Sequence, residues 1–148
     1  MRIIDLMKTD VVTLSPSDTV AAARGEMARQ HFRHVPIVER GELVGMVSEG
    51  DLRGATREDL ELRAIMTSPV ASLAPNASVR QAANLLRGRK IGCVPIVEDG
   101  KLVGIVTETD LLELVSRGPA AVRDRLGRRG HGSPSVAAAR SRGIRRGP

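Results

Sequence analysis

The chain has 148 residues, of which 41% are hydrophobic and 27% charged, a composition typical of a globular protein large enough to bury a core. It contains one Phe, no Tyr or Trp and one Cys, which excludes aromatic base-stacking platforms, a disulfide framework and a cysteine-rich zinc site. No apolar run approaches the roughly 18 residues of a membrane span, and Asp5 and Lys8 interrupt any signal-peptide core. We therefore expect a soluble, cytoplasmic protein with no membrane partner.

The formal net charge of +6 is unevenly distributed along the chain. Residues 117–148 contain nine arginines and one aspartate, whereas residues 1–116 contain 14 basic and 16 acidic residues, a net charge of −2. This C-terminal tail is rich in Gly, Arg, Ser, Ala and Pro, which predicts disorder, although residues 119–126 could form a short helix. The basic tail has two interpretations, an arm that binds nucleic acid or a solvated extension without a function.

The rest of the chain consists of two copies of one unit. Offset by 59 positions, residues 7–52 and 66–111 align without a gap and are identical at 19 of 46 positions. We therefore expect two similar halves, residues 1–58 and 59–116, that pack about a pseudo-twofold axis and precede the tail.

Each repeat begins with a short apolar strand, at residues 11–14 and 70–73, followed by a turn rich in Ser, Ala, Pro, Asp and Asn. A helix comes next, because apolar residues recur at helical spacing. These residues are Val20, Ala23 and Met27 in the first repeat, and Val79, Ala82 and Leu86 in the second.

The last three elements of each repeat are predicted to be a β-hairpin and a second helix. The hairpin strands flank Arg40-Gly41 in the first repeat and Asp99-Gly100 in the second. Asp-Gly is a strong turn signal because both positions tolerate positive φ, whereas Arg40 fits less well and predicts a looser turn. The second helix begins at Ser48 or Thr107. The predicted fold class is α/β (α+β), with two β-α-β-β-α repeats.

A motif of a hydroxyl and a carboxylate opens this second helix in both repeats, as Ser48 with Asp51 and Thr107 with Asp110. One interpretation is structural: a capping box in which the two side chains satisfy free amides at the helix N-terminus. The other is functional. The helix amides and the hydroxyl would form a phosphate site, while the carboxylate would accept hydrogen bonds from both hydroxyls of a ribose.

Both repeats resemble cystathionine-β-synthase (CBS) domains, and residues 3–116 resemble a tandem CBS pair. The resemblance rests on Met7 and Met66, on the two VPIV segments, on GMVS and GIVT, and on the two motifs that open the second helices. It implies that these motifs hold the ribose and phosphates of an adenine nucleotide. The protein would then be a regulatory module that binds AMP, ATP or another adenosyl compound and acts on a separate partner. The resemblance also implies a homodimer formed through the helices.

The resemblance implies two pockets for the base, each combining apolar residues of one repeat with the motif of the other. One would contain Leu6, Val11, Phe32 and Arg33 with Thr107 and Asp110; the other would contain Ile65, Val70, Ile91 and Gly92 with Ser48 and Asp51. Arg33 and His34 would contact phosphates, whereas Gly92 adds no charge. The apolar members would equally line a core in a protein that binds nothing.

No combination of residues indicates catalysis, a metal site or a required cofactor. Ser48 and Thr107 have no evident base partner, and His31 and His34 lack an evident third ligand. Cys93 is expected to be a small buried apolar residue. We expect a binding module rather than an enzyme. The alternative is a nucleic-acid-associated protein in which the CBS pair is a dimerising scaffold and the tail binds.

Overall fold

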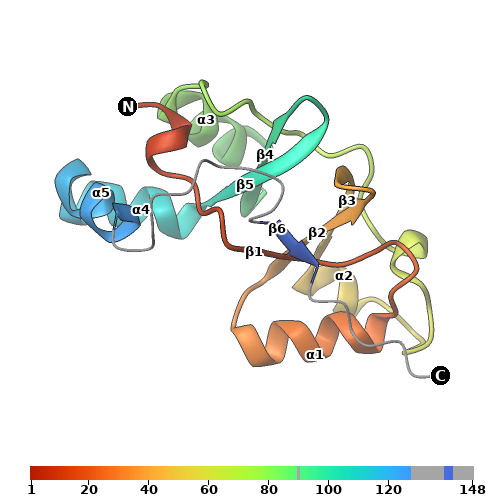
Figure 1. Ribbon diagram of the computed structural model, residues 1–148. Coiled ribbons are helices and arrows are strands. Elements are labelled where there is room, and N and C mark those ends of the chain that lie inside the picture. Colours follow the sequence, from red (N-terminus) through yellow and green to blue (C-terminus); the bar gives the residue numbers. More distant parts are fainter. Residues whose placement is uncertain (90, 128–138, 142–148) are drawn as a thin grey trace. The chain divides into compact units, whose positions relative to one another are not determined.

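The computed structural model describes residues 1–89, 91–127 and 139–141 (Figure 1). Its elements in chain order are η1 (Ile3–Asp5), β1 (Val11–Thr13), α1 (Val20–Gln30), β2 (His34–Glu39), β3 (Glu42–Ser48), α2 (Glu49–Arg53), η2 (Leu62–Ala64), α3 (Val79–Arg89), β4 (Cys93–Glu98), β5 (Lys101–Thr107), α4 (Glu108–Arg117), α5 (Pro119–Gly127) and β6 (Ala139–Ser141). Mixed helices and antiparallel strands confirm the predicted α/β class.

The described residues divide into two compact units. Unit 1 contains the described residues of Met1–Val11 and Ala71–Ala139, and unit 2 contains those of Val12–Val70 and Arg140–Pro148. Unit 1 therefore includes α3, β4, β5, α4 and α5, whereas unit 2 includes α1, β2, β3 and α2.

Each unit contains a segment that the sequence repeat assigns to the other half. In unit 1, the amide of Ile3 donates to the carbonyl of Ala77 at 2.8 Å, which ties the N-terminal segment to the second repeat. In unit 2, the amide of Leu62 donates to the carbonyl of Asp18 at 2.8 Å, which ties the start of the second repeat to the first. The compact units therefore do not share the boundaries of the sequence repeats.

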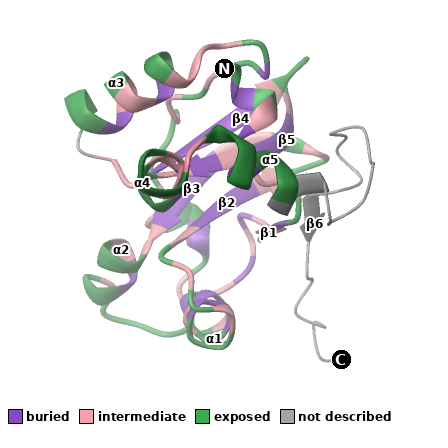
Figure 2. Cartoon of the chain, turned by 90° about the vertical axis from the view of Figure 1, so that its left-hand side faces the viewer, coloured by how far each residue is buried: buried purple, intermediate pink, exposed green. Residues whose placement is uncertain are grey.

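Each unit has its own apolar core, and the predicted helices face it as expected. The core of unit 1 is formed by Ile3, Leu6, Met7, Ala82, Leu86, Val94, Ile96, Val103, Val106 and Val122. The core of unit 2 is formed by Leu14, Val20, Ala23, Met27, Val35, Ile37, Val47, Leu52 and Leu62. Figure 2 shows α1 and α3 each with a buried and an exposed side, which is the amphipathic pattern predicted from the residue spacing.

The two hairpins have the same geometry, so the prediction of a looser first turn was wrong. φ is +54° at Arg40 and +81° at Gly41, against +51° at Asp99 and +78° at Gly100. Positive φ at both central residues is what a type I′ turn requires, and Arg40 adopts it because the paired strands on both sides hold the turn. In both hairpins the register shifts once, after Ile37 and after Ile96, a pair of bulges that the alternation of residues had not indicated.

The first strand of each repeat is shorter than predicted. In the second repeat, only Leu73 pairs with the hairpin, through a parallel bridge to Ile96, and no strand forms at residues 70–73. The amide of Leu73 donates to the carbonyl of Pro95 at 3.2 Å, but proline has no amide to continue the ladder toward residue 71. The equivalent bridge in the first repeat joins Leu14 to Ile37 beside Pro36, and residues 11–13 form a strand there because they pair with β6.

Helix α5 lies where the sequence allowed a short helix, at residues 119–126 of the tail whose composition predicted disorder. Val122 of this helix is fully buried in the core of unit 1, so a short helix forms here because it has one apolar residue to bury. The predicted disorder of residues 128–138 and 142–148 lies outside the described residues. In the part of the chain that the structure describes, no helix has both the length and the apolar composition to cross a membrane.

We predict that Gly104→Ala lowers the Tm more than Gly45→Ala. A Cβ at Gly104 would lie 2.8 Å from the backbone oxygen of Lys8, which is held by the amide of Ile105, whereas the three atoms nearest to a Cβ at Gly45 all belong to the flexible side chain of Met66. Overpacking against rigid backbone costs about 1–3 kcal/mol. Thermal unfolding followed by circular dichroism compares the two variants, and equal losses would contradict a rigid contact at Gly104.

Candidate functional site

The two motifs form complete capping boxes. Ser48 Oγ accepts from the amide of Asp51 at 3.1 Å, and Asp51 Oδ2 accepts from the amide of Ser48 at 2.8 Å. The same two bonds join Thr107 and Asp110 at 3.3 and 2.8 Å. Capping uses one oxygen of each carboxylate and only the oxygen of each hydroxyl. The structural and functional interpretations are therefore compatible, because Oδ1 and the hydroxyl proton remain outside the cap.

The first amides of these helices are less free than the sequence suggested. The amide of Glu49 donates to the carbonyl of Arg33 at 2.9 Å, and the amide of Glu108 donates to the carbonyl of Gly92 at 3.3 Å. The third amide of each helix is already bound by the capping hydroxyl. Only the second amide stays outside these bonds, so a phosphate here would depend on side chains rather than on a cluster of helix amides.

The two carboxylates differ in their surroundings. Asp110 is fully buried, and its Oδ1 lies 3.0 Å from Lys8 Nζ but accepts no well-directed hydrogen bond. Lys8 reaches this position because its backbone pairs with Ile105, with both hydrogen bonds at 2.9 Å. No pattern in the sequence indicates this ion pair, since it joins residues that are far apart in the chain.

Asp51 has no such partner. The residue aligned with Lys8 in the second repeat is Thr67, whose backbone pairs with Met46 through bonds of 2.9 and 3.1 Å. The segment therefore lies in the same place against its hairpin, but a threonine side chain carries no charge. Asp51 is partly exposed, and among the described residues no cation forms an ion pair with it.

Cys93 lies close enough to this ion pair to be influenced by both of its charges. The pKa of the thiol is raised to about 12, mainly by burial and in addition by the negative charge of Asp110, while Lys8 opposes both effects. At neutral pH the thiol is therefore protonated and a poor nucleophile. The structure confirms Cys93 as a small buried residue.

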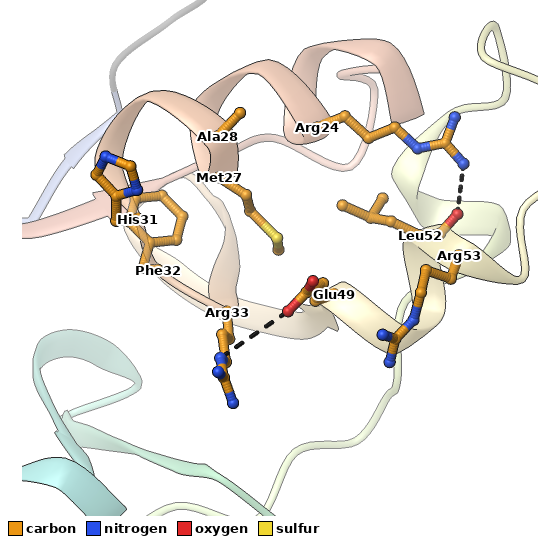
Figure 3. Close-up of a pocket in the computed structure, with 9 residues that line it drawn as sticks. All are labelled: Arg24, Met27, Ala28, His31, Phe32, Arg33, Glu49, Leu52 and Arg53. Atoms are coloured by element: carbon orange, nitrogen blue, oxygen red, sulfur yellow. Dashed lines mark hydrogen bonds and ion pairs between the residues drawn. The ribbon is translucent and has the colours of Figure 1, made fainter.

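A pocket of about 690 Å³ lies in unit 2 between α1 and α2 (Figure 3). It is lined by Arg24, Met27, Ala28, His31, Phe32, Arg33, Glu49, Leu52 and Arg53. Figure 3 shows Met27 and Leu52 pointing into the space between the helices, with the arginines around it. The pocket therefore combines an apolar floor with a mostly cationic rim.

The rim of this pocket contains both predicted and unpredicted residues. Phe32 and Arg33 were predicted from the family resemblance, whereas Arg24 and Arg53 were not, because they lie on helices whose spacing indicated only the core-facing side. Arg33 is 83% exposed and lies 4.0 Å from Glu49, a distance at which an exposed ion pair contributes little. His34 does not line the pocket but pairs with Ser48 across the hairpin.

The predicted site residues are distributed over both units. Unit 1 contains Val11, Ile91, Gly92, Thr107 and Asp110; unit 2 contains Phe32, Arg33, His34, Ser48, Asp51 and Val70. Each predicted base pocket draws residues from both units and therefore stays a prediction. Within the described ranges, no group of three or more His, Cys, Asp or Glu side chains could hold a metal ion.

Two hairpin units that each lead into a capped helix with the same motif define a tandem-repeat α/β protein. The family model for the CBS domain matches residues 3–58 and 62–117, and the chain belongs to the CBS-domain family. This confirms the resemblance seen in the sequence.

Three comparisons describe its relatives. The CBS domain-containing protein YhcV of Bacillus subtilis is 33% identical over 112 residues, which cover 72% of this chain and 80% of YhcV. An inosine-5′-monophosphate dehydrogenase of Korarchaeum cryptofilum is 34% identical over 120 residues, covering 80% of this chain but 25% of the enzyme. The solved CBS domain pair of protein MJ0100, in complex with 5′-methylthioadenosine and S-adenosyl-L-methionine, has a TM-score of 0.74 and 26% identity, covering 79% of this chain and 97% of that one. Since this chain spans only a quarter of the dehydrogenase, the match does not assign that activity to it.

Proposed function

We propose that this protein is a regulatory module that binds an adenosyl ligand, such as AMP or ATP, and acts on a separate protein. The observation that carries the proposal is the second carboxylate oxygen of each motif, which capping leaves unused in both copies. Family membership and the adenosyl compounds bound by the CBS pair of MJ0100 support it. No cofactor is required, and no catalytic step is assigned.

In this proposal there are two ribose sites. Asp51 holds the ribose in one of them, and Asp110 holds it in the other. Two neighbouring hydroxyls of a sugar donate hydrogen bonds to Oδ1, and bonds to a charged acceptor are stronger than bonds between neutral groups. The hydroxyl protons of Ser48 and Thr107 are available as additional donors to a phosphate. Capping fixes both side chains before the ligand arrives, which reduces the entropy lost on binding.

The remaining predicted residues have supporting roles. Arg33 and His34 are proposed to contact phosphates. The base would lie against apolar or small residues, namely Val11, Phe32, Val70, Ile91 and Gly92. None of these residues supplies a carboxylate for the sugar, so their substitution is expected to weaken binding rather than abolish it.

We predict that AMP, ATP or S-adenosylmethionine raises the Tm, and that the double variant Asp51→Asn, Asp110→Asn loses this response. At a ligand concentration of 100 Kd the stabilisation is about 2.7 kcal/mol, which corresponds to a shift of about 5–10 °C in a protein of this size. Asparagine keeps one oxygen for the cap but removes the charge that attracts the sugar hydroxyls. Differential scanning fluorimetry measures the shift.

The matched control is Asp18→Asn. Asp18 Oδ2 accepts from the amide of Ser15 at 2.7 Å, so this carboxylate stabilises a turn outside both motifs. The control variant is expected to have a lower Tm than the wild type but the same ligand response. The proposal fails if no adenosyl compound stabilises the wild type, or if the double variant responds fully.

The nucleic-acid interpretation assigned binding to the arginines of the tail. Residues 128–138 and 142–148 are not described, and in the remainder of the chain no observation favours nucleic-acid binding over a regulatory module.

We propose that the protein associates with a second copy through α4. Leu112 and Val115 lie three residues apart on this helix and are 69% and 84% exposed. Two large apolar side chains on one face of a helix favour burial against another surface. A second copy is the partner that the family resemblance implied from the sequence.

We predict that Leu112→Lys with Val115→Lys weakens self-association about 10⁴-fold, since both copies lose two apolar side chains that each contribute about 1.5 kcal/mol. Size-exclusion chromatography with light scattering measures the mass. Arg117→Glu changes the charge on the opposite side of the same helix, at a side chain that is 71% exposed, and is expected to leave the dimer intact. A wild type that is monomeric at micromolar concentration, or a double variant that remains dimeric, would exclude this surface.

A further inference from the structure

The ion pair of Lys8 with Asp110 has no counterpart at the other motif. Asp110 Oδ1 lies 3.0 Å from Lys8 Nζ and is fully buried, whereas the lysine side chain is 34% exposed. At the aligned position the chain has Thr67, and Asp51 is partly exposed. The two motifs therefore have the same caps but a different charge beside them.

A sugar at Asp110 would have to take the oxygen that Lys8 now occupies. Because the carboxylate is fully buried, a ligand reaches Oδ1 only if a neighbouring group moves, and Lys8 is the partly exposed group that touches it. Once hydroxyls donate to Oδ1, the ammonium loses part of its counter-charge. Within the described residues, Asp110 is the one acidic side chain that forms an ion pair with Lys8.

The free energy needed to move Lys8 away from Asp110 Oδ1 depends on the ligand. A phosphate on the ligand would give the ammonium a new negative partner, and a charge-assisted hydrogen bond would form. A neutral nucleoside would leave the ammonium partly desolvated without a counter-charge, which is unfavourable. The sulfonium group of S-adenosylmethionine would add a like charge.

We propose that Lys8 makes the Thr107–Asp110 motif selective for nucleosides that carry a phosphate. The inference rests on the proposed function, because it concerns the specificity of one of the two proposed ribose sites. It assigns to Lys8 a role that neither the motif nor the repeat indicates, since position 67 of the other copy is a threonine.

The test compares AMP with adenosine, which differ only in the phosphate. Isothermal titration calorimetry is carried out on the full chain with Asp51→Asn, which removes the charge of the other motif and keeps an oxygen for its cap. This chain is expected to bind AMP at least tenfold more tightly than adenosine. Adding Lys8→Gln is expected to reduce the affinity for AMP about tenfold. The ratio of AMP affinity to adenosine affinity then falls to near one.

Two further variants control for folding and for net charge. Gln keeps a hydrogen-bond donor for the buried carboxylate, and Lys8→Thr, which copies the other repeat, is expected to remove the preference in the same way. Lys101→Thr removes a lysine at the opposite end of β5 from Thr107 and is expected to leave the ratio unchanged.

The outcomes separate this inference from the proposed function. If the Lys8 variants keep the preference for AMP, or if the Asp51→Asn chain binds neither ligand while the wild type binds one, the inference is wrong and the proposed function stands. If the wild type binds no adenosyl compound, the proposed function fails and the inference fails with it.

Discussion

The capping box at the end of each hairpin is the interaction on which both the local fold and the proposed site depend. It fixes the first turn of α2 and α4 against the preceding strand and orients a carboxylate at a known place. Because each carboxylate has two oxygens and the cap uses one, the same residues can stabilise the helix and still offer an acceptor. One carboxylate can therefore cap the helix with one oxygen and bind a ligand with the other.

The electrostatics at each cap are set by a segment from the start of the opposite sequence repeat. Pairing with Ile105 places Lys8 beside Asp110, and pairing with Met46 places Thr67 in the equivalent position of unit 2. Duplication preserved the backbone pairing, and a difference at one position then made the two carboxylates unequal. Such an arrangement allows one fold to hold two ligands of different charge.

The sequence predicted the parts of this structure that depend on local patterns. Residue spacing such as that of Val20 and Ala23 indicated the helices, and the hydroxyl–carboxylate spacing indicated the caps, because both effects act within a few residues. It did not predict the missing strand near Leu73, the positive φ of Arg40 or the ion pair of Lys8. These features arise from the lack of a partner strand such as the one that β6 gives to β1, from the constraint of paired strands and from a contact across the chain, none of which a local pattern contains.

The central claim is that the carboxylate oxygen that the cap does not use holds the sugar of an adenosyl ligand. The pocket with Arg24, Arg33 and Arg53 on its rim is a competing place for a phosphate, so the position of the ligand decides between them. A crystal structure of the full chain grown with AMP measures that position directly. The account predicts ribose hydroxyls within hydrogen-bond distance of Asp51 or Asp110 Oδ1, and AMP bound only between α1 and α2 would contradict it.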